Sequence, residues 1–208
     1  MDKVHTITNK LLNTNTYFYI DDFNCIIIDP GSDYDRIRSY IYANKLVVIA
    51  ILATHGHFDH VASVAKLKEE FGVDFYLHSK DSKTLKLANF IMKMFGFSRR
   101  IEIPSVDYFI DGLNGTLKVQ NYSVEYLNTP GHTHGSCIFK IKNNIFTGDT
   151  LFYLDSESKI PNENLSELAS SQSQIFDHFN DDALFWPGHN KGGQLKDIKK
   201  HSLDNKHD

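Results

Sequence analysis

The feature that most constrains the fold is an uninterrupted apolar run at residues 46–53, with the sequence LVVIAILA. Half of its residues are the β-branched Val47, Val48, Ile49 and Ile51. Branched side chains favour strands because they pack well on a pleated surface. A run without polar residues is typical of a strand that is covered on both sides. We therefore predict a central strand that is buried on both faces.

Residues 54–60, THGHFDH, follow this strand directly and concentrate metal-binding groups. Three imidazoles (His55, His57, His60) and the Asp59 carboxylate suit zinc, and also iron or manganese. If the chain stays extended, His55 and His57 point to the same side, because side chains alternate along a strand. Asp59 and His60 then come from the following turn, which allows two metal subsites on one loop. The stretch is internal and mixed in composition, unlike a purification tag. Four potential ligands in six positions are also hard to explain as hydrogen-bonded residues of a protein core.

Three later segments each place a histidine or an aspartate in a tight turn after a predicted strand. They are TPGHTHGS with His132, FTGDT with Asp149, and WPGH with His189. Glycine lets the backbone turn tightly, so the polar side chain emerges at the end of the strand. One such turn is weak evidence, because a histidine in a turn is usually just exposed. Together with residues 54–60, the three predict a shared metal site at one edge of the fold.

The remaining pattern is strand-rich in both halves. Period-two runs and turn residues predict strands, and apolar spacing of three and four predicts helices. Asn114-Gly115 is among the expected turns. Two strand-rich halves with helices favour an α+β fold, with two sheets packed face to face and helices outside. Doubly wound α/β is the alternative, disfavoured by the many short hairpin-like turns. The expected strands are 4–8, 16–20, 24–29, 46–53, 74–78, 109–110, 116–119, 124–128, 136–141, 144–147 and 183–186, and the expected helices are 33–44, 61–71, 80–95 and 165–179.

Length and charge narrow the class of protein. A chain of 208 residues is long enough for one sizeable core, so we expect one domain over residues 1–195 and a polar, solvated tail at 196–208. The net charge of −4 gives no general support for nucleic-acid binding. There is no leader-like segment and no run long enough to span a membrane, so we expect a cytoplasmic protein. Cys25 and Cys137 lie outside any CxxC pair and are expected to be buried, although a disulfide between them stays open.

Taken together, these motifs resemble the metallo-β-lactamase superfamily over nearly the whole chain. The match consists of HxHxDH at residues 55–60 followed in order by His132, Asp149 and His189. The resemblance implies a four-layer αββα sandwich of two mixed sheets with two divalent metal ions, zinc above all, at one edge. It assigns His55, His57 and His132 to one ion and Asp59, His60 and His189 to the other. Asp149 would bridge both ions, and Asp59 could also orient a hydroxide.

The residues within these motifs are most similar to those of glyoxalase II-like hydrolases. THGHFDH, TPGHTHGS, GDTLF and PGH all resemble that group, which implies hydrolysis of a thioester by a metal-bridging hydroxide. Asp149 stands where the commonest true β-lactamases have a cysteine, which disfavours β-lactam hydrolysis. We expect this protein to lack the C-terminal helical extension of glyoxalase II, and residues 153–159 replace a typical Gly-Arg pair. The sequence therefore leaves open whether the thiol carrier is glutathione, coenzyme A or a carrier protein.

Two other readings of the same ligands remain. A mononuclear iron persulfide dioxygenase would use His55, His132 and Asp149, and a phosphodiester or lactone hydrolase would use all seven. A purely structural metal site is disfavoured, because structural zinc is normally four-coordinate and often bound by cysteine. The sequence leaves open the roles of His134 and Cys137, the oligomeric state and the metal that is loaded.

Overall fold

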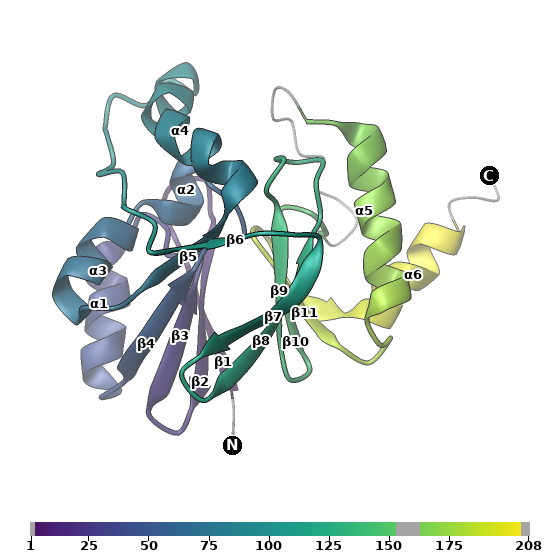
Figure 1. Cartoon of the computed structure of the whole chain (residues 1–208), viewed down its shortest axis with the longest axis horizontal. Coiled ribbons are helices and arrows are strands. Elements are labelled where there is room, and N and C mark those ends of the chain that lie inside the picture. Colours follow the sequence, from purple (N-terminus) through teal and green to yellow (C-terminus); the bar gives the residue numbers. More distant parts are fainter. Residues whose placement is uncertain (1–2, 153–162, 205–208) are drawn as a thin grey trace. The chain divides into compact units, whose positions relative to one another are not determined.

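The computed structural model describes residues 3–152 and 163–204 (Figure 1). The chain divides into two compact units, Met1–Asp111 and Gly112–Asp208, and each is built on one six-stranded mixed sheet. No helix in the described part of the chain has the length and apolar character needed to cross a membrane. The cytoplasmic location stays a prediction.

The sheet of the first unit has the strand order β1-β2-β3-β4-β5-β6. The first three strands are joined by hairpins and run antiparallel, whereas β3 to β6 are parallel neighbours. Helical segments make each parallel crossover, as such connections require. The bounds are β1 Lys3–Thr8, β2 Asn15–Asp21, β3 Asn24–Ile28, α1 Tyr34–Ala43, β4 Val47–Leu52, α2 Phe58–Val61, α3 Val64–Phe71, β5 Phe75–His78, the 3₁₀ helix η1 Ser79–Asp81, α4 Ser82–Met94 and β6 Tyr108–Ile110.

Strand β4 is the predicted central strand, and it is buried on both faces. Val48, Ile51 and Ala53 join the apolar core formed with Ile37 and Ile41 of α1 and with Val64 and Leu67 of α3. Figure 1 shows α1 and α3 side by side along this sheet. The alternate residues Ala50 and Leu52 are fully buried as well. The apolar run thus has the covered position that its composition predicted.

The sheet of the second unit has the order β12-β11-β10-β9-β8-β7. Strands β7 to β10 form an antiparallel meander, and β11 pairs parallel with β10. Helices α5 and α6 cover one face, with Ile175, Leu195 and Ile198 packed on Ile145 and Phe185. The bounds are β7 Asn114–Val119, β8 Tyr122–Asn128, β9 Cys137–Ile141, β10 Asn144–Gly148, α5 Leu165–His178, β11 Leu184–Pro187, β12 Gly193–Gln194 and α6 Leu195–Asp204.

Two local expectations differ from the structure. Asn114-Gly115 opens strand β7 instead of forming a turn, because the bare Gly115 backbone lets the Tyr126 ring of the paired strand lie against it. The stretch expected to be a solvated tail carries most of helix α6, because Leu195 and Ile198, three residues apart, both bury their side chains. The boundary of the expected domain at residue 195 stays a prediction.

Candidate metal centre

The first donor set, His55, His57, Asp59 and His60, lies immediately after β4 and is buried. The chain does not stay extended there, which corrects the expected geometry. Residues 53–57 form an irregular loop, and Asp59 and His60 stand on the short helix α2. The loop is held against the start of α4, because the Gly56 N–H donates to Asp81 Oδ2 at 2.6 Å. A Cβ at Gly56 would lie 2.8 Å from the backbone nitrogen of Leu85, so only glycine fits this approach.

The His55 and His57 rings converge as predicted, although a loop and not a strand brings them together. His55 Nε2 lies 3.0 Å from His57 Nδ1. The Thr54 hydroxyl donates to Asp29 Oδ2 at 2.7 Å, so its oxygen is left to accept from the Nδ1–H of His55 at 3.1 Å. A neutral His55 then carries its lone pair on Nε2. This nitrogen faces His57, which prepares both rings to bind one ion.

Asp29 organises the first donor set, although no motif in the sequence marks it. It follows β3 with a φ of 51°, and its carboxylate accepts the Thr54 N–H at 2.7 Å. The same carboxylate lies 3.0 Å from His60 Nδ1, which fixes the proton on Nδ1 and the lone pair on Nε2. The parallel pairing of β3 and β4, which the sequence pattern does not reveal, places it there. A carboxylate at the end of one strand is then placed beside the loop that follows the other.

Asp59 presents its carboxylate beside His60. Asp59 Oδ2 lies 3.5 Å from His60 Nε2 and accepts a hydrogen bond from the Thr14 hydroxyl at 2.5 Å. The hydrogen bond from Thr14 orients the carboxylate. The pair therefore offers one oxygen and one nitrogen from adjacent positions of α2.

The second donor set is His132, Asp149 and His189, and each member follows a strand as predicted. Strands β8 and β10 both run antiparallel to β9, and β11 runs parallel to β10. Their carboxyl ends therefore meet at one edge of the sheet. Asp149 Oδ2 lies 3.4 Å from Nε2 of His132 and also 3.4 Å from Nε2 of His189. The His189 side chain is 21% exposed, so this set opens toward solvent.

Glu163 supports His132, and no local motif marks it either. Its Oε1 lies 3.1 Å from His132 Nδ1, and both side chains are buried. A carboxylate at Nδ1 holds the proton there and leaves Nε2 to face Asp149. The same arrangement in both donor sets, Asp29 behind His60 and Glu163 behind His132, is typical of metal-ligating histidines.

The donor atoms fit divalent metal ions. Two ligands that each lie about 2.0–2.2 Å from one tetrahedral zinc are separated by about 3.3–3.6 Å. The nitrogen-to-oxygen separations of 3.4 and 3.5 Å in both sets match that spacing. They exceed the usual length of an N–H···O hydrogen bond. Buried imidazoles and carboxylates are also the donors that zinc, iron and manganese share.

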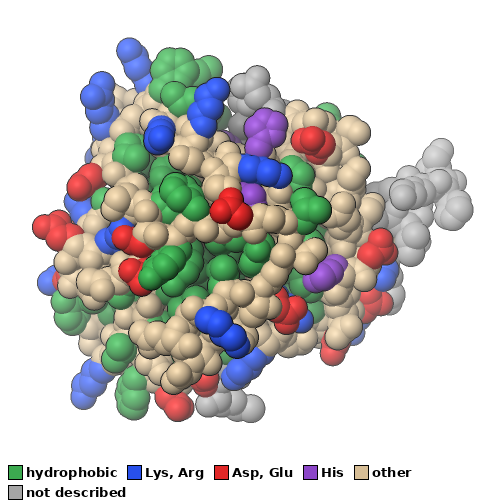
Figure 2. Space-filling model, viewed as in Figure 1, with side chains coloured by type: hydrophobic (Ala, Val, Ile, Leu, Met, Phe, Trp, Pro, Cys, Tyr) green, Lys and Arg blue, Asp and Glu red, His purple; other side chains and the backbone are tan. Residues whose placement is uncertain are grey.

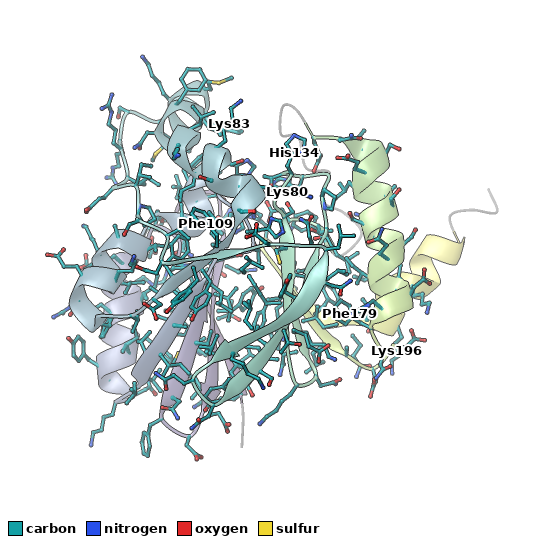
Figure 3. All side chains as sticks on the ribbon, in the orientation of Figure 1. Lys80, Lys83, Phe109, His134, Phe179 and Lys196 are labelled. Carbon is teal, nitrogen blue, oxygen red and sulfur yellow. The ribbon has the colours of Figure 1, made fainter. Side chains whose placement is uncertain are left out.

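The remaining singled-out residues lie outside the donor sets. Cys25 and Cys137 are buried free thiols, so they form no disulfide with each other, and burial raises the pKa of the Cys25 thiol. His134 is exposed (Figure 3). His78 is buried at the end of β5, where its ring accepts the Lys80 N–H.

Gly131 is required beside His132, and its replacement by alanine should destabilise the protein. Its φ is 138°, and a Cβ would lie 2.4 Å from the backbone nitrogen of Leu168. We expect Gly131→Ala to lower the free energy of unfolding by about 2–4 kcal/mol, from overpacking and backbone strain together. Gly96→Ala is the matched control, because its φ of 82° is also positive but nothing lies within 4 Å. Urea unfolding should show the smaller loss for Gly96→Ala; equal losses would contradict the packing argument.

Comparisons with known proteins agree with this geometry. A family model described as "Metallo-beta-lactamase superfamily" matches residues 9–190. The probable metallo-hydrolase YqgX of Bacillus subtilis (strain 168) is 35% identical over 145 residues, which cover 68% of this chain and 67% of that protein. The hydroxyacylglutathione hydrolase GloC of Haemophilus influenzae is 31% identical over 177 residues, 81% of each chain.

Two solved structures are also similar over almost their full lengths. The BLEG-1 B3 metallo-β-lactamase superposes with a TM-score of 0.87 at 25% identity, covering 96% of this chain and 97% of that one. TTHA1623, solved in a di-iron-bound form, has a TM-score of 0.80 at 26% identity, covering 92% and 95%. The two mixed sheets with their helices match the α+β sandwich fold of this family, as predicted. The chain therefore belongs to the metallo-β-lactamase superfamily.

Proposed function

We propose that this metal-dependent hydrolase binds two divalent ions and cleaves thioesters. The observation that carries the proposal is the composition of the two donor sets, which offer nitrogen and oxygen atoms at ligand spacing without any thiolate. We assign His55, His57 and His132 to one ion, and Asp59, His60 and His189 to the other. Asp149 is assigned to both. Seven donors exceed what one closed four-coordinate ion can use, which favours two ions with open positions.

Two such ions would supply a hydroxide near neutral pH and would polarise the carbonyl of a bound ester. The protein's own residues prepare this chemistry. Asp29 and Glu163 keep the protons of His60 and His132 on Nδ1, so that Nε2 of each ring stays available. Thr14 orients the Asp59 carboxylate, which we propose as the group that positions the attacking water. The His189 side chain is 21% exposed, and we propose that substrate enters beside it.

A thioester is the substrate class that the sequence favours. The motifs THGHFDH, TPGHTHGS and GDTLF resemble glyoxalase II-like hydrolases, and the similarity to GloC supports that branch. A thiolate leaves readily, so no protein acid is needed to protonate the leaving group. Zinc is the metal we propose; the di-iron form of TTHA1623 makes iron the alternative to test.

The test is a thioester panel on protein of measured metal content. Lactoylglutathione, an acyl coenzyme A and an acyl carrier protein should be compared by thiol release. Nitrocefin belongs in the panel because of the similarity to BLEG-1. Two zinc ions per chain with thiol release support the proposal. One iron with oxygen uptake would instead identify a persulfide dioxygenase, and phosphodiester or lactone cleavage alone would identify the other hydrolase class.

His57→Ala should abolish most of this activity. His57 lies 3.0 Å from His55 and supplies one of the proposed ligands, so its loss removes a contact to the ion. We expect thiol release to fall about 100-fold or more, which corresponds to a loss of about 3 kcal/mol of transition-state stabilisation. His178→Ala, at an exposed position of α5, is the control and should keep full activity. Full activity of His57→Ala would exclude His57 as a ligand.

A further inference from the structure

Helix α4 presents a stripe of large apolar side chains to solvent. Leu85, Ala88 and Met92 form its buried face. Leu87, Phe90 and Met94, at helical spacing of three and four, are 41%, 62% and 63% exposed. Figure 2 shows hydrophobic side chains gathered at the top of the view, where α4 lies in Figure 1. A contiguous exposed apolar face with a polar rim is typical of an interaction surface.

The rim of this stripe is basic. Six exposed cations lie within residues 79–100, in a chain whose net charge is −4. The only acidic residue of that range is Asp81, which is buried and bonded to Gly56. Lys80 of η1 and Lys83 of α4 lie at the N-terminal end of this helix (Figure 3), and Lys and Arg side chains lie next to the apolar atoms at the top of Figure 2. The cations are Lys80, Lys83, Lys86, Lys93, Arg99 and Arg100. The surface is therefore complementary to an acidic partner.

The same helix supports the loop that carries the first donor set. Asp81, at the N-terminus of α4, accepts the Gly56 N–H, and Phe58 of α2 packs on Ala88 and Met92. The face of α4 opposite the apolar stripe thus packs on the metal-binding loop. The stripe itself covers residues 87–94. A partner bound on the stripe is separated from the loop by the width of one helix, about 10–12 Å. A substrate carried on a flexible arm of the partner can span that distance.

We propose that the α4 face, defined as Lys83, Lys86, Leu87, Phe90, Lys93 and Met94, binds an acidic carrier protein whose acyl thioester is the substrate. The apolar residues supply the centre of the interface and the lysines its rim, which is the usual anatomy of such contacts. The thioester part of this inference rests on the proposed function. The docking part rests only on the exposure and charge of α4.

The test compares two substrates that share one thioester: a hexanoyl acyl carrier protein and hexanoyl-pantetheine, which lacks the protein. Two variants of the metal-loaded full chain are compared. One combines Phe90→Ser with Met94→Ser and removes the apolar centre. The other combines Lys83→Glu, Lys86→Glu and Lys93→Glu and reverses the charge of the rim. Both should raise KM for the carrier substrate about tenfold with kcat unchanged, while hexanoyl-pantetheine is cleaved as before. Phe23→Ser, which changes a side chain that is 63% exposed in the β2–β3 turn, and Lys118→Glu are the matched controls and should change neither substrate.

Direct binding of the carrier protein, followed by fluorescence anisotropy, separates the two proposals. Binding that the α4 variants weaken, without any thiol release, would keep the docking surface and overturn the thioesterase. Thiol release with the same KM for both substrates, or a carrier KM that the variants leave unchanged, would overturn the docking surface alone. Binding to phosphatidylglycerol vesicles in place of the carrier would also overturn it and assign the face to a membrane.

Discussion

Asp149→Asn should lower the rate of thioester hydrolysis about 1,000-fold, the largest effect that we expect from a single substitution. Asp149 Oδ2 lies 3.4 Å from Nε2 of both His132 and His189, so it is the carboxylate that joins the second donor set. Asparagine keeps the shape but removes the charge, and its amide is a poor ligand for two cations. A 1,000-fold loss corresponds to about 4 kcal/mol of transition-state stabilisation, which is the scale of a metal contribution.

The measurement pairs steady-state thiol release with metal content. Asp149→Asn should bind fewer metal ions per chain, and its circular dichroism spectrum should match that of the unchanged protein. Asp177→Asn, at an exposed position of α5, controls for removal of a carboxylate from the same unit and should keep its metals and its rate. Two ions per chain and a rate within tenfold of normal in Asp149→Asn would show that Asp149 does not bridge the ions.

Asp29→Asn should weaken metal binding about 10–100-fold although Asp29 is not expected to touch a metal. Its carboxylate accepts from the Thr54 N–H and hydroxyl and lies against His60 Nδ1. An asparagine amide cannot accept at all these positions, so a buried donor faces the N–H₂ group. Outer carboxylates of this kind typically contribute that factor to metal affinity. The unsatisfied donor should also lower the free energy of unfolding by about 1–3 kcal/mol.

Competition with a chromogenic chelator measures the affinity, and urea unfolding of metal-free protein measures the stability. Asp22→Asn is the matched control, because Asp22 has a φ of 54° close to the 51° of Asp29 but is exposed. Asparagine tolerates this backbone conformation as well as aspartate does. An unchanged affinity in Asp29→Asn would mean that the hydrogen bonds of Asp29 only stabilise the fold.

The position of β4 and the residues that cluster in both donor sets could be predicted from the sequence, because each has a strong local signal, and metal binding by those residues stays a prediction. An unbroken apolar run needs two covered faces. The four potential ligands within residues 55–60 are too close together in the sequence to be ordinary core or surface residues. The turns that carry His132, Asp149 and His189 each follow a strand, and strand direction then brings them to one edge of the second sheet. The family resemblance added which donors share an ion, and that assignment remains a proposal.

Residue type and spacing within short segments were enough to predict most strands, the cluster of histidines and aspartates, and the family. How these side chains are held depends on contacts between segments that are distant in the sequence. Asp29 and Glu163 reach their histidines across 31 positions in each case. Gly56 meets Asp81 from 25 positions away, which bends the loop that the sequence alone would leave extended. Helix α6 likewise replaced an expected tail because Leu195 and Ile198 find a sheet to cover. Periodicity and propensity describe neighbours along the chain, whereas these contacts depend on which strands become neighbours in space.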